Sequence, residues 1–297
     1  ILHDRNGKKW VVSLEWETRE GYEKPGAICL VEYDPGIKAV AGYPKRIWRG
    51  GTDRGCIEAP HLYQRGDWYY LMCAEGGTGY NHCVTMGRAG HVWGPYEGDS
   101  ANPIVTSNPG SSNERQDPDH LKPQYYYPDA ELQKAGHGSF VETPRGEVYL
   151  VHLASRPFLP ELRCTLGRET GIQRMKWTRD GWLRMEDGSN LAKMEVKESS
   201  LPPCPVKPEI SRDDFADPEL NICYYSPRIL PKRFVDLKAR PGYVRLRGGE
   251  SACSLNKVSL LARKLTSVNA QATVKMEFAP EVYQHSAGLI LYYDNMN

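Results

Sequence analysis

The chain has 297 residues, of which 40% are apolar and 25% charged, an ordinary globular composition with enough length for one large core or two domains. Lysine plus arginine number 38 and aspartate plus glutamate 37, without long blocks of either sign, which argues against a general attraction to nucleic acid. No run approaches the roughly 18 to 20 continuous apolar residues of a membrane span, so neither nucleic acid nor a membrane is an expected partner.

Short aromatic and β-branched runs between glycine, proline and asparagine turns dominate the chain, and helical periodicity is almost absent. Three segments resemble one another: "LHDRNGKKWVVSLE" from Leu2, "LYQRGDWYYLMCAE" from Leu62 and "VETPRGEVYLVHLA" from Val141. Each has a strand end, a polar turn with glycine and a second strand, at spacings of about 60 and 80 residues, typical of propeller blades. The sequence therefore predicts an all-β fold with repeated four-stranded sheets.

The domain boundaries follow from where this pattern stops, near Asn190. A closed propeller needs at least four blades, and about three are present, so we expect the missing part to precede Ile1. We assign residues 1–197 to the later blades of a propeller and the proline-rich residues 198–212 to a linker. Residues 213–297 are predicted to form an incomplete β-sandwich. Its expected strands are residues 242–248, 258–265, 272–278 and 287–294.

The eight cysteines contain no Cys-x-x-Cys pair, which argues against a structural zinc site. Several lie inside apolar runs such as "AICLVEY" and "YYLMCAE". We therefore expect buried free thiols, which mildly favours a reducing, cytoplasmic compartment and does not exclude secretion.

Glu58 is a single acidic residue between Ile57 and Ala59-Pro60, at the start of an apparently buried strand. Two interpretations stand at this point. The carboxylate pairs with an arginine such as Arg54, or apolar neighbours raise its pKa so that it keeps a proton for catalysis.

Three long segments carry a resemblance to a known family: "TDRGCIEAPHLYQRGDWYYLMCAEGGTGYNH", "QKAGHGSFVETPRGEVYLVHLASRP" and "CTLGRETGIQRMKWTRDGW". Together they resemble glycoside hydrolase family 43, in the branch of β-xylosidases with a C-terminal β-sandwich. The resemblance implies a five-bladed propeller with a pocket at one end of its axis. It also implies exo-acting, inverting hydrolysis of β-1,4-xylo-oligosaccharides, and some relatives release arabinofuranose.

The resemblance also implies roles for single residues. Glu58 matches the general acid of the (T/I)-E-(G/A)-P-H-L-Y motif. The aspartates that act as general base and as pKa modulator match positions upstream of Ile1, so Asp4 is not assigned as the base. Arg168 matches an arginine that binds substrate hydroxyls, with an ion pair to Glu169 or another carboxylate as the alternative. His137 matches the histidine on the propeller axis.

The remaining implied contacts are less specific. In some relatives the axial histidine helps to hold a water-ligated calcium. We therefore expect either calcium near His137 or a core histidine whose hydrogen bonds are made within the protein. No cofactor is expected to be required. Trp16 matches an aromatic pocket wall and Thr78 a polar contact beside the pocket, and either could be ordinary blade packing. The polar insertion 111–137 leaves the preference between xylose and arabinose open.

Three functions remain: an exo-acting β-xylosidase, a carbohydrate-binding propeller without activity because the base is absent, and a scaffold for protein partners. We expect residues 1–297 alone to be inactive unless the N-terminal segment is supplied as a partner or another carboxylate, such as Glu75 or Asp4, acts as base. The oligomeric state, including a homo-oligomer, stays open.

Overall fold

A computed structural model describes residues 1–16, 26–110 and 123–296 of the chain. The chain divides into two compact units, Ile1–Pro202 and Pro203–Asn297, each described below by itself. Within the described residues, no helix combines the length and the apolar character needed to cross a membrane.

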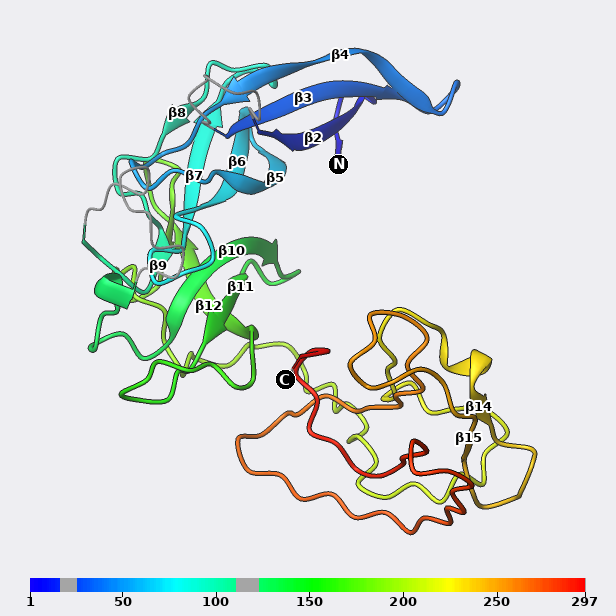
Figure 1. The fold of residues 1–297 in the computed structure, drawn as a ribbon. Coiled ribbons are helices and arrows are strands. Elements are labelled where there is room, and N and C mark those ends of the chain that lie inside the picture. Colours follow the sequence, from blue (N-terminus) through cyan, green and yellow to red (C-terminus); the bar gives the residue numbers. More distant parts are fainter. Residues whose placement is uncertain (17–25, 111–122, 297) are drawn as a thin grey trace, which may run out of the picture. The chain divides into compact units, whose positions relative to one another are not determined.

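The first unit contains three antiparallel sheets that follow one another in chain order (Figure 1). The first sheet has the order β1-β2-β3-β4. Its strands are β1 (Leu2–His3), β2 (Lys9–Glu15), β3 (Ala27–Asp34) and β4 (Ala39–Trp48).

The second sheet has the order β5-β6-β7-β8, and β9 pairs with another part of β7. Its strands are β5 (Glu58–Arg65), β6 (Trp68–Glu75), β7 (Cys83–Ala89), β8 (Glu97–Gly98) and β9 (Val105–Thr106). A short 3-10 helix, η2 (Pro123–Tyr125), precedes the next sheet.

The third sheet has the order β10-β11-β12-β13. Its strands are β10 (Gln133–Glu142), β11 (Val148–Ser155), β12 (Glu169–Trp177) and β13 (Leu183–Met185).

The three similar sequence segments form the same structural unit. They are the first hairpin of each sheet, in which Leu2 pairs with Trp10, Arg65 with Trp68, and Glu142 with Val148. The prediction of repeated blades from this pattern is confirmed; the first and third sheets have four strands, and the second has β9 as a fifth.

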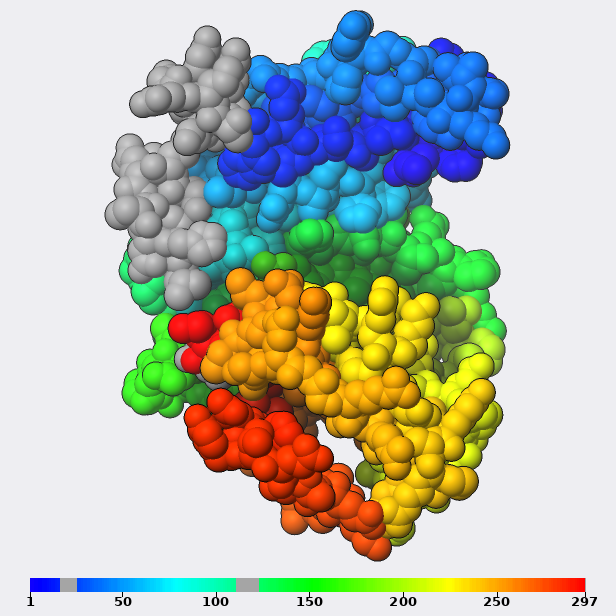
Figure 2. Space-filling view, turned by 45° about the vertical axis from the view of Figure 1, so that its right-hand side comes forward, coloured from blue at the N-terminus to red at the C-terminus, as the bar shows by residue number. Residues whose placement is uncertain are grey.

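Strand β6 is buried on both faces and connects the cores of the unit. Tyr70 and Met72 belong to an apolar cluster shared with the third sheet. Leu71 and Cys73 belong to another cluster, shared with the first sheet. Because successive side chains of a strand point to opposite faces, the second sheet lies between the other two. Figure 2 shows the same succession, from blue through cyan to green, on the surface of this unit.

The second unit forms little regular structure among its described residues. It contains a 3-10 helix, η3 (Pro231–Arg233), and a two-stranded sheet of β14 (Val235–Asp236) and β15 (Arg245–Leu246). Isolated bridges join Tyr225 to Ala262 and Glu250 to Val258.

The four predicted sandwich strands are only partly present in this unit. Residues 242–248 contain β15 and residues 258–265 contain the two bridge residues, whereas 272–278 and 287–294 form no strand. A strand requires a hydrogen-bonded neighbour and a cover for its apolar face. These two segments have neither here, and side chains such as Val274 and Leu289 are more than half exposed.

All eight cysteines are free, and their burial differs. Cys29, Cys73, Cys83 and Cys223 are buried, Cys56 and Cys164 are half-buried, and Cys204 and Cys253 are exposed. The prediction of buried thiols therefore fails for the last two, which lie in the second unit where little apolar surface is covered.

Thiol labelling of the native protein at pH 8 should separate these classes. Cys204 and Cys253 should react first, because the thiolate is the reactive form and access limits its reaction. Burial raises the pKa of Cys29 to about 11 and that of Cys83 to about 12, so both should react slowly. Unfolding in denaturant should release eight thiols.

The variant Cys204→Ser, Cys253→Ser should lose the fast phase and keep the slow one. Rapid native labelling of Cys83, or a native disulfide found by mass mapping, would contradict this assignment.

Candidate functional site

Glu58 is the first residue of β5, and the backbone around it is irregular. It pairs with Ala74 of β6, and the register shifts before the next pair, His61 with Met72. Ala59 has a φ of 50°. A β-bulge of this kind bends a strand and redirects a side chain. Glu58 pairs with Ala74 just before the bulge, so its half-buried side chain lies on the same face of the second sheet as Met72, the face that packs towards the third sheet.

His137 of β10 lies at a comparable irregularity in the third sheet. Register shifts occur on both sides of Gly136, His137 lies within the second of them, before Ser139, and its own φ is 55°. Its imidazole is exposed. Positive φ is unfavourable for a residue with a Cβ, so the surrounding pairs must hold this conformation in place.

His82 immediately precedes β7 and is the third member of the site. Its side chain is only 2% exposed. The carbonyl oxygen of Lys134 lies 3.1 Å from Nδ1 and can only accept, so Nδ1–H donates and Nε2 carries the lone pair. Nε2 has no hydrogen-bond partner among the described residues.

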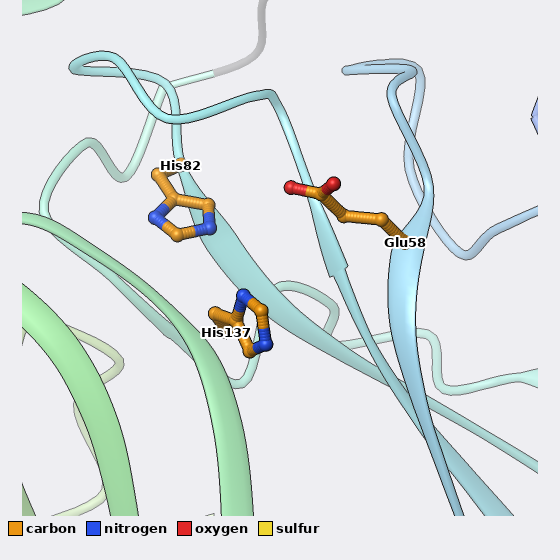
Figure 3. Close-up of side chains that lie close together, drawn as sticks. All are labelled: Glu58, His82 and His137. Carbon is orange, nitrogen blue, oxygen red and sulfur yellow. The ribbon is translucent and has the colours of Figure 1, made fainter. Parts of the chain in front are cut away.

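These three side chains converge on one point. One possible ligand atom from each of Glu58, His82 and His137 lies within 4.8 Å of the others. Figure 3 shows the carboxylate of Glu58 directed towards the two imidazole rings, which come from the second and third sheets. The second and third blades thus meet at a small polar cluster beside the irregular parts of β5 and β10.

Gly136 is required for this approach. A Cβ at residue 136 would lie 2.4 Å from the His82 ring, well inside van der Waals contact. The glycine turn that leads to His82 is equally tight, because Gly76 has a φ of +82° and a Cβ there would lie 2.0 Å from the Asn81 carbonyl oxygen.

Burial lowers the pKa of His82 to about 4, well below the usual histidine value of about 6.5. The hydrogen bond to Lys134 acts in the opposite direction, and the positive charges of His137, Arg168 and His152 lower the pKa further. His82 is therefore a neutral imidazole at neutral pH.

Arg54 does not pair with Glu58, so the first interpretation of the lone carboxylate is not observed. Its buried guanidinium donates to the carbonyl oxygens of Asn81 (3.1 Å), Asn108 (2.6 Å) and Gly110 (2.8 Å), and to the hydroxyl of Thr106 (3.0 Å). Arg54 therefore holds the segment before His82 in place and does not neutralise the Glu58 carboxylate.

Glu75 and Asp4, the other carboxylates considered as bases, are held in structural hydrogen bonds. Glu75 accepts from the Gly51 and Thr52 amides and from the Thr52 and Thr85 hydroxyls, and burial raises its pKa although these bonds oppose the rise.

Asp4 accepts from Trp10 Nε1 at 3.1 Å and from the Tyr69 hydroxyl at 2.9 Å. Burial acts to raise its pKa, but the hydrogen bonds outweigh it and lower the pKa. Neither Asp4 nor Glu75 is available to activate water in this arrangement.

The other predicted site residues, Arg168, Thr78 and Trp16, are not members of this cluster. Arg168 is exposed, and its charge acts on His82. It does not pair with Glu169, whose carboxylate binds Arg156 at 2.6 Å. Thr78 is half-buried in the turn between β6 and β7, and Trp16 is 40% exposed after β2. No contact among the described residues joins either to the cluster.

A cavity of about 250 Å³ adjoins the cluster at His137. It is lined by His61, His137, Ser139, Val151, His152, Leu153 and Thr170. Burial lowers the pKa of His61, and the charge of His137 lowers it further. Sequence analysis did not single out His61 or His82. The available signal for His82 was its place at the end of a glycine turn, directly before a strand.

The cluster does not match a calcium site built from protein ligands. Calcium takes six to eight oxygen ligands. The three side chains provide one carboxylate and two imidazoles. Calcium near His137 therefore stays a prediction that depends on water ligands.

Comparison with known families gives two matches. The family described as "Glycosyl hydrolases family 43" matches residues 1–183. The family described as "Beta xylosidase C-terminal Concanavalin A-like domain" matches residues 212–297. Together with the three blades and the solved structures described next, these matches confirm the fold class, blades of a five-bladed propeller followed by a β-sandwich domain.

Among curated proteins, the chain is 37% identical to a "Beta-xylosidase" of Bacillus subtilis, with 100% of this chain and 54% of that protein covered. It is also 37% identical to "Xylosidase/arabinosidase 43B" of Humicola insolens, covering 100% and 52%. The crystal structure of xylan beta-1,4-xylosidase from Bacillus halodurans has 43% identity and a TM-score of 0.80, with 90% of this chain and 48% of that chain covered. The chain spans about half the length of the curated relatives it matches.

Gly136→Ala should destabilise the protein by about 1 to 3 kcal/mol, because the new methyl group overlaps the buried His82 ring. Denaturant unfolding measures the change. Gly90→Ala is the matched control, since a Cβ there meets nothing within 4 Å, and it should change stability by less than about 0.5 kcal/mol. Equal effects of the two variants would contradict the close packing at His82.

The pH dependence of stability should show that His82 is buried as a neutral imidazole. Between about pH 4 and 6.5 the unfolded chain binds a proton at this residue that the folded protein does not, so the free energy of unfolding falls as the pH is lowered through this window. The difference in pKa corresponds to about 3 kcal/mol, and His152, whose pKa burial also lowers, adds to it.

An NMR titration should find the His82 imidazole neutral down to about pH 4. Urea unfolding of His82→Gln should show a flatter pH slope, whereas His91→Gln, at an exposed histidine, should keep it. A His82 midpoint near 6.5 would contradict the assignment.

Proposed function

This chain belongs to the glycosyl hydrolases of family 43, and we propose on that premise that it forms part of an exo-acting, inverting β-xylosidase in which Glu58 is the general acid. The observation that carries the proposal is the position of Glu58. Its side chain lies on the face of the second sheet that packs towards the third, is not paired with Arg54, and meets His82 and His137 next to a cavity.

Glu58 would protonate the glycosidic oxygen as the bond to the leaving sugar breaks. An inverting enzyme also needs a carboxylate across the sugar, roughly 6.5 to 9.5 Å away, to activate water. Asp4 and Glu75 are engaged elsewhere, so we assign the base to no described residue.

Arg168 and His137 are proposed to bind substrate. A guanidinium presents several donors in fixed geometry, which suits neighbouring sugar hydroxyls. Arg168 is exposed, and the neighbouring Glu169 forms its ion pair with Arg156 instead. Among the described residues, Glu169 therefore does not compete with a ligand for the Arg168 guanidinium. Trp16 and Thr78 remain proposed pocket contacts.

The proposed substrate is a β-1,4-linked xylo-oligosaccharide, with arabinofuranosides as a further possibility. This rests on the names of relatives, which include a beta-xylosidase and a xylosidase/arabinosidase. The cavity geometry by itself does not distinguish the two sugars.

A carbohydrate-binding propeller without activity is the second candidate. The observation that favours it is the engagement of Asp4 and Glu75, since the described residues then supply an acid without a base. The two candidates differ in whether a protein with this chain turns over substrate or only binds it.

Glu58→Gln should reduce hydrolysis of xylobiose by roughly 100-fold to 10,000-fold, because its leaving group needs a proton. An aryl xyloside with a good leaving group should lose much less activity. The two kcat/KM ratios, measured on a protein that contains the whole chain, test the role.

Glu142→Gln makes the same change at an exposed position in β10 and should leave both ratios unchanged. Equal losses on the two substrates for Glu58→Gln would remove the general-acid role. Binding of xylotriose without any turnover by the unmodified protein would favour the second candidate.

A further inference from the structure

We propose that the end of the second and third sheets away from Glu58 carries a second carbohydrate site, in which the exposed indole ring of Trp68 stacks on a sugar ring of a neutral polysaccharide chain. The site goes beyond the proposed reaction, because it binds the polymer without cleaving it. Only the choice of xylan as the polymer rests on the proposed function.

The site lies at the hairpin end of the second sheet. Arg65 ends β5 and pairs with Trp68, which begins β6, whereas Glu58 begins β5 and pairs with Ala74. At about 3.3 Å per residue, the eight residues of β5 separate these two ends by roughly 20 Å. A sugar ring stacked on Trp68 therefore does not occupy the cluster that contains Glu58.

Side chains from three neighbouring strands line this end of the sheet. Trp68 lies on the same face of β6 as Tyr70, since side chains two residues apart in a strand share a face. Arg65 pairs with Trp68, and Arg88 of β7 pairs with Tyr70, so both arginines lie on this face as well. Because Tyr70 belongs to the apolar cluster shared with the third sheet, this face is the one directed towards that sheet.

Arginine and tryptophan side chains are stacked there. The guanidinium carbon of Arg88 lies 4.5 Å from the ring centroid of Trp68 and 4.2 Å from that of Trp182. The guanidinium carbon of Arg65 lies 4.5 Å from the ring centroid of Trp177. Trp177 ends β12 and Trp182 immediately precedes β13, so the stack joins the second sheet to the third.

Trp68 is the open member of this stack. It is 39% exposed, whereas Trp182, on the other side of Arg88, is 7% exposed. Arg88 is itself fixed, because it donates to the Glu97 carboxylate at 2.8 Å and to the Asp180 carbonyl oxygen at 2.5 Å. An aromatic ring that is held in place before a ligand arrives loses little conformational entropy on binding.

The charges beside the ring favour a neutral ligand. Arg88 forms an ion pair with Glu97 at 2.8 Å, and Arg65 forms one with Glu142 at 3.6 Å. Each arginine therefore has its counter-charge, and a polyanion gains no unmatched positive charge at this place. An aromatic face with paired polar groups at its edge suits a pyranose ring, whose C–H groups contact the indole and whose hydroxyls meet the polar groups.

The consequence is a difference between polymeric and short substrates. Unsubstituted xylan is a neutral chain of pyranose rings, long enough to be held at Trp68 while another part of the chain is free. A disaccharide is too short to contact both Trp68 and the Glu58 cluster. The second site therefore affects the binding of the polymer and leaves the hydrolysis of xylobiose unchanged.

Affinity electrophoresis in gels that contain neutral, soluble arabinoxylan tests the binding on a protein with the whole chain. Trp68→Ala should weaken retardation by the polymer about two- to tenfold, the effect of losing one stacking contact, and Trp68→Phe should retain more of it. Tyr43→Ala is the matched control, since Tyr43 is a 91% exposed aromatic residue in β4, and it should migrate as the unmodified protein does. Equal retardation of Trp68→Ala and the unmodified protein would overturn the site.

Fluorine NMR of protein labelled with 5-fluorotryptophan reports on the ring itself. The chain has seven tryptophans, and the signal that is missing in Trp68→Phe identifies Trp68. Xylohexaose should shift this signal, and heparin, a polyanion, should not. This titration uses the unmodified sequence, so it stays valid if Trp68→Ala does not fold. An unchanged Trp68 signal at saturating xylohexaose would show a purely structural ring and overturn the site.

Turnover separates this site from the proposed function. Trp68→Ala should keep the kcat/KM of the unmodified protein for xylobiose, while its binding to arabinoxylan falls. Polymer binding that depends on Trp68 in a protein without any hydrolysis would support the second site and contradict the glycosidase. Hydrolysis of xylobiose combined with polymer binding that an excess of xylobiose abolishes would place the polymer at the Glu58 cluster and overturn the second site alone.

Discussion

The burial of β6 on both faces is the constraint on which the first unit depends. Tyr70 and Met72 pack towards the third sheet, and Leu71 and Cys73 towards the first. A shift of one residue would exchange these two sets, so the register of the second sheet is fixed by both neighbours at once. The positions of β5 and β7, which pair with β6, follow from it, and with them the positions of Glu58 and His82.

The site is built from departures from regular sheet geometry. A bulge follows Glu58 in β5 and register shifts interrupt β10 around His137, and Gly76 and Gly136 permit backbone approaches that a Cβ would prevent. Buried polar anchors hold these irregular parts in place. Arg54 binds the segment that precedes His82, and Glu75 binds the loop at residues 51–52. A site built from irregular backbone in this way requires a rigid support.

Much of the fold and part of the site could be predicted from sequence. The hairpin repeats predicted the blades because strand alternation and turn residues are local signals. The family resemblance singled out Glu58 and His137, which the structure brings together with His82. His82 was missed because its importance arises from burial and from contacts with Lys134 and Gly136, which lie more than fifty residues away in the chain.

The sequence by itself determined the all-β class, the repeating unit and the likeness to family 43, because each is expressed in local patterns or contiguous motifs. It also showed Glu58 as a lone carboxylate, but left its pairing with Arg54 open. Only the tertiary structure decided that Arg54 and Glu75 hold neighbouring loops in place by hydrogen bonds. It also decided that the imidazole of His82, with an unpartnered Nε2, faces the Glu58 carboxylate. These outcomes depend on which distant groups share one buried space, where desolvation and hydrogen-bond satisfaction decide the arrangement.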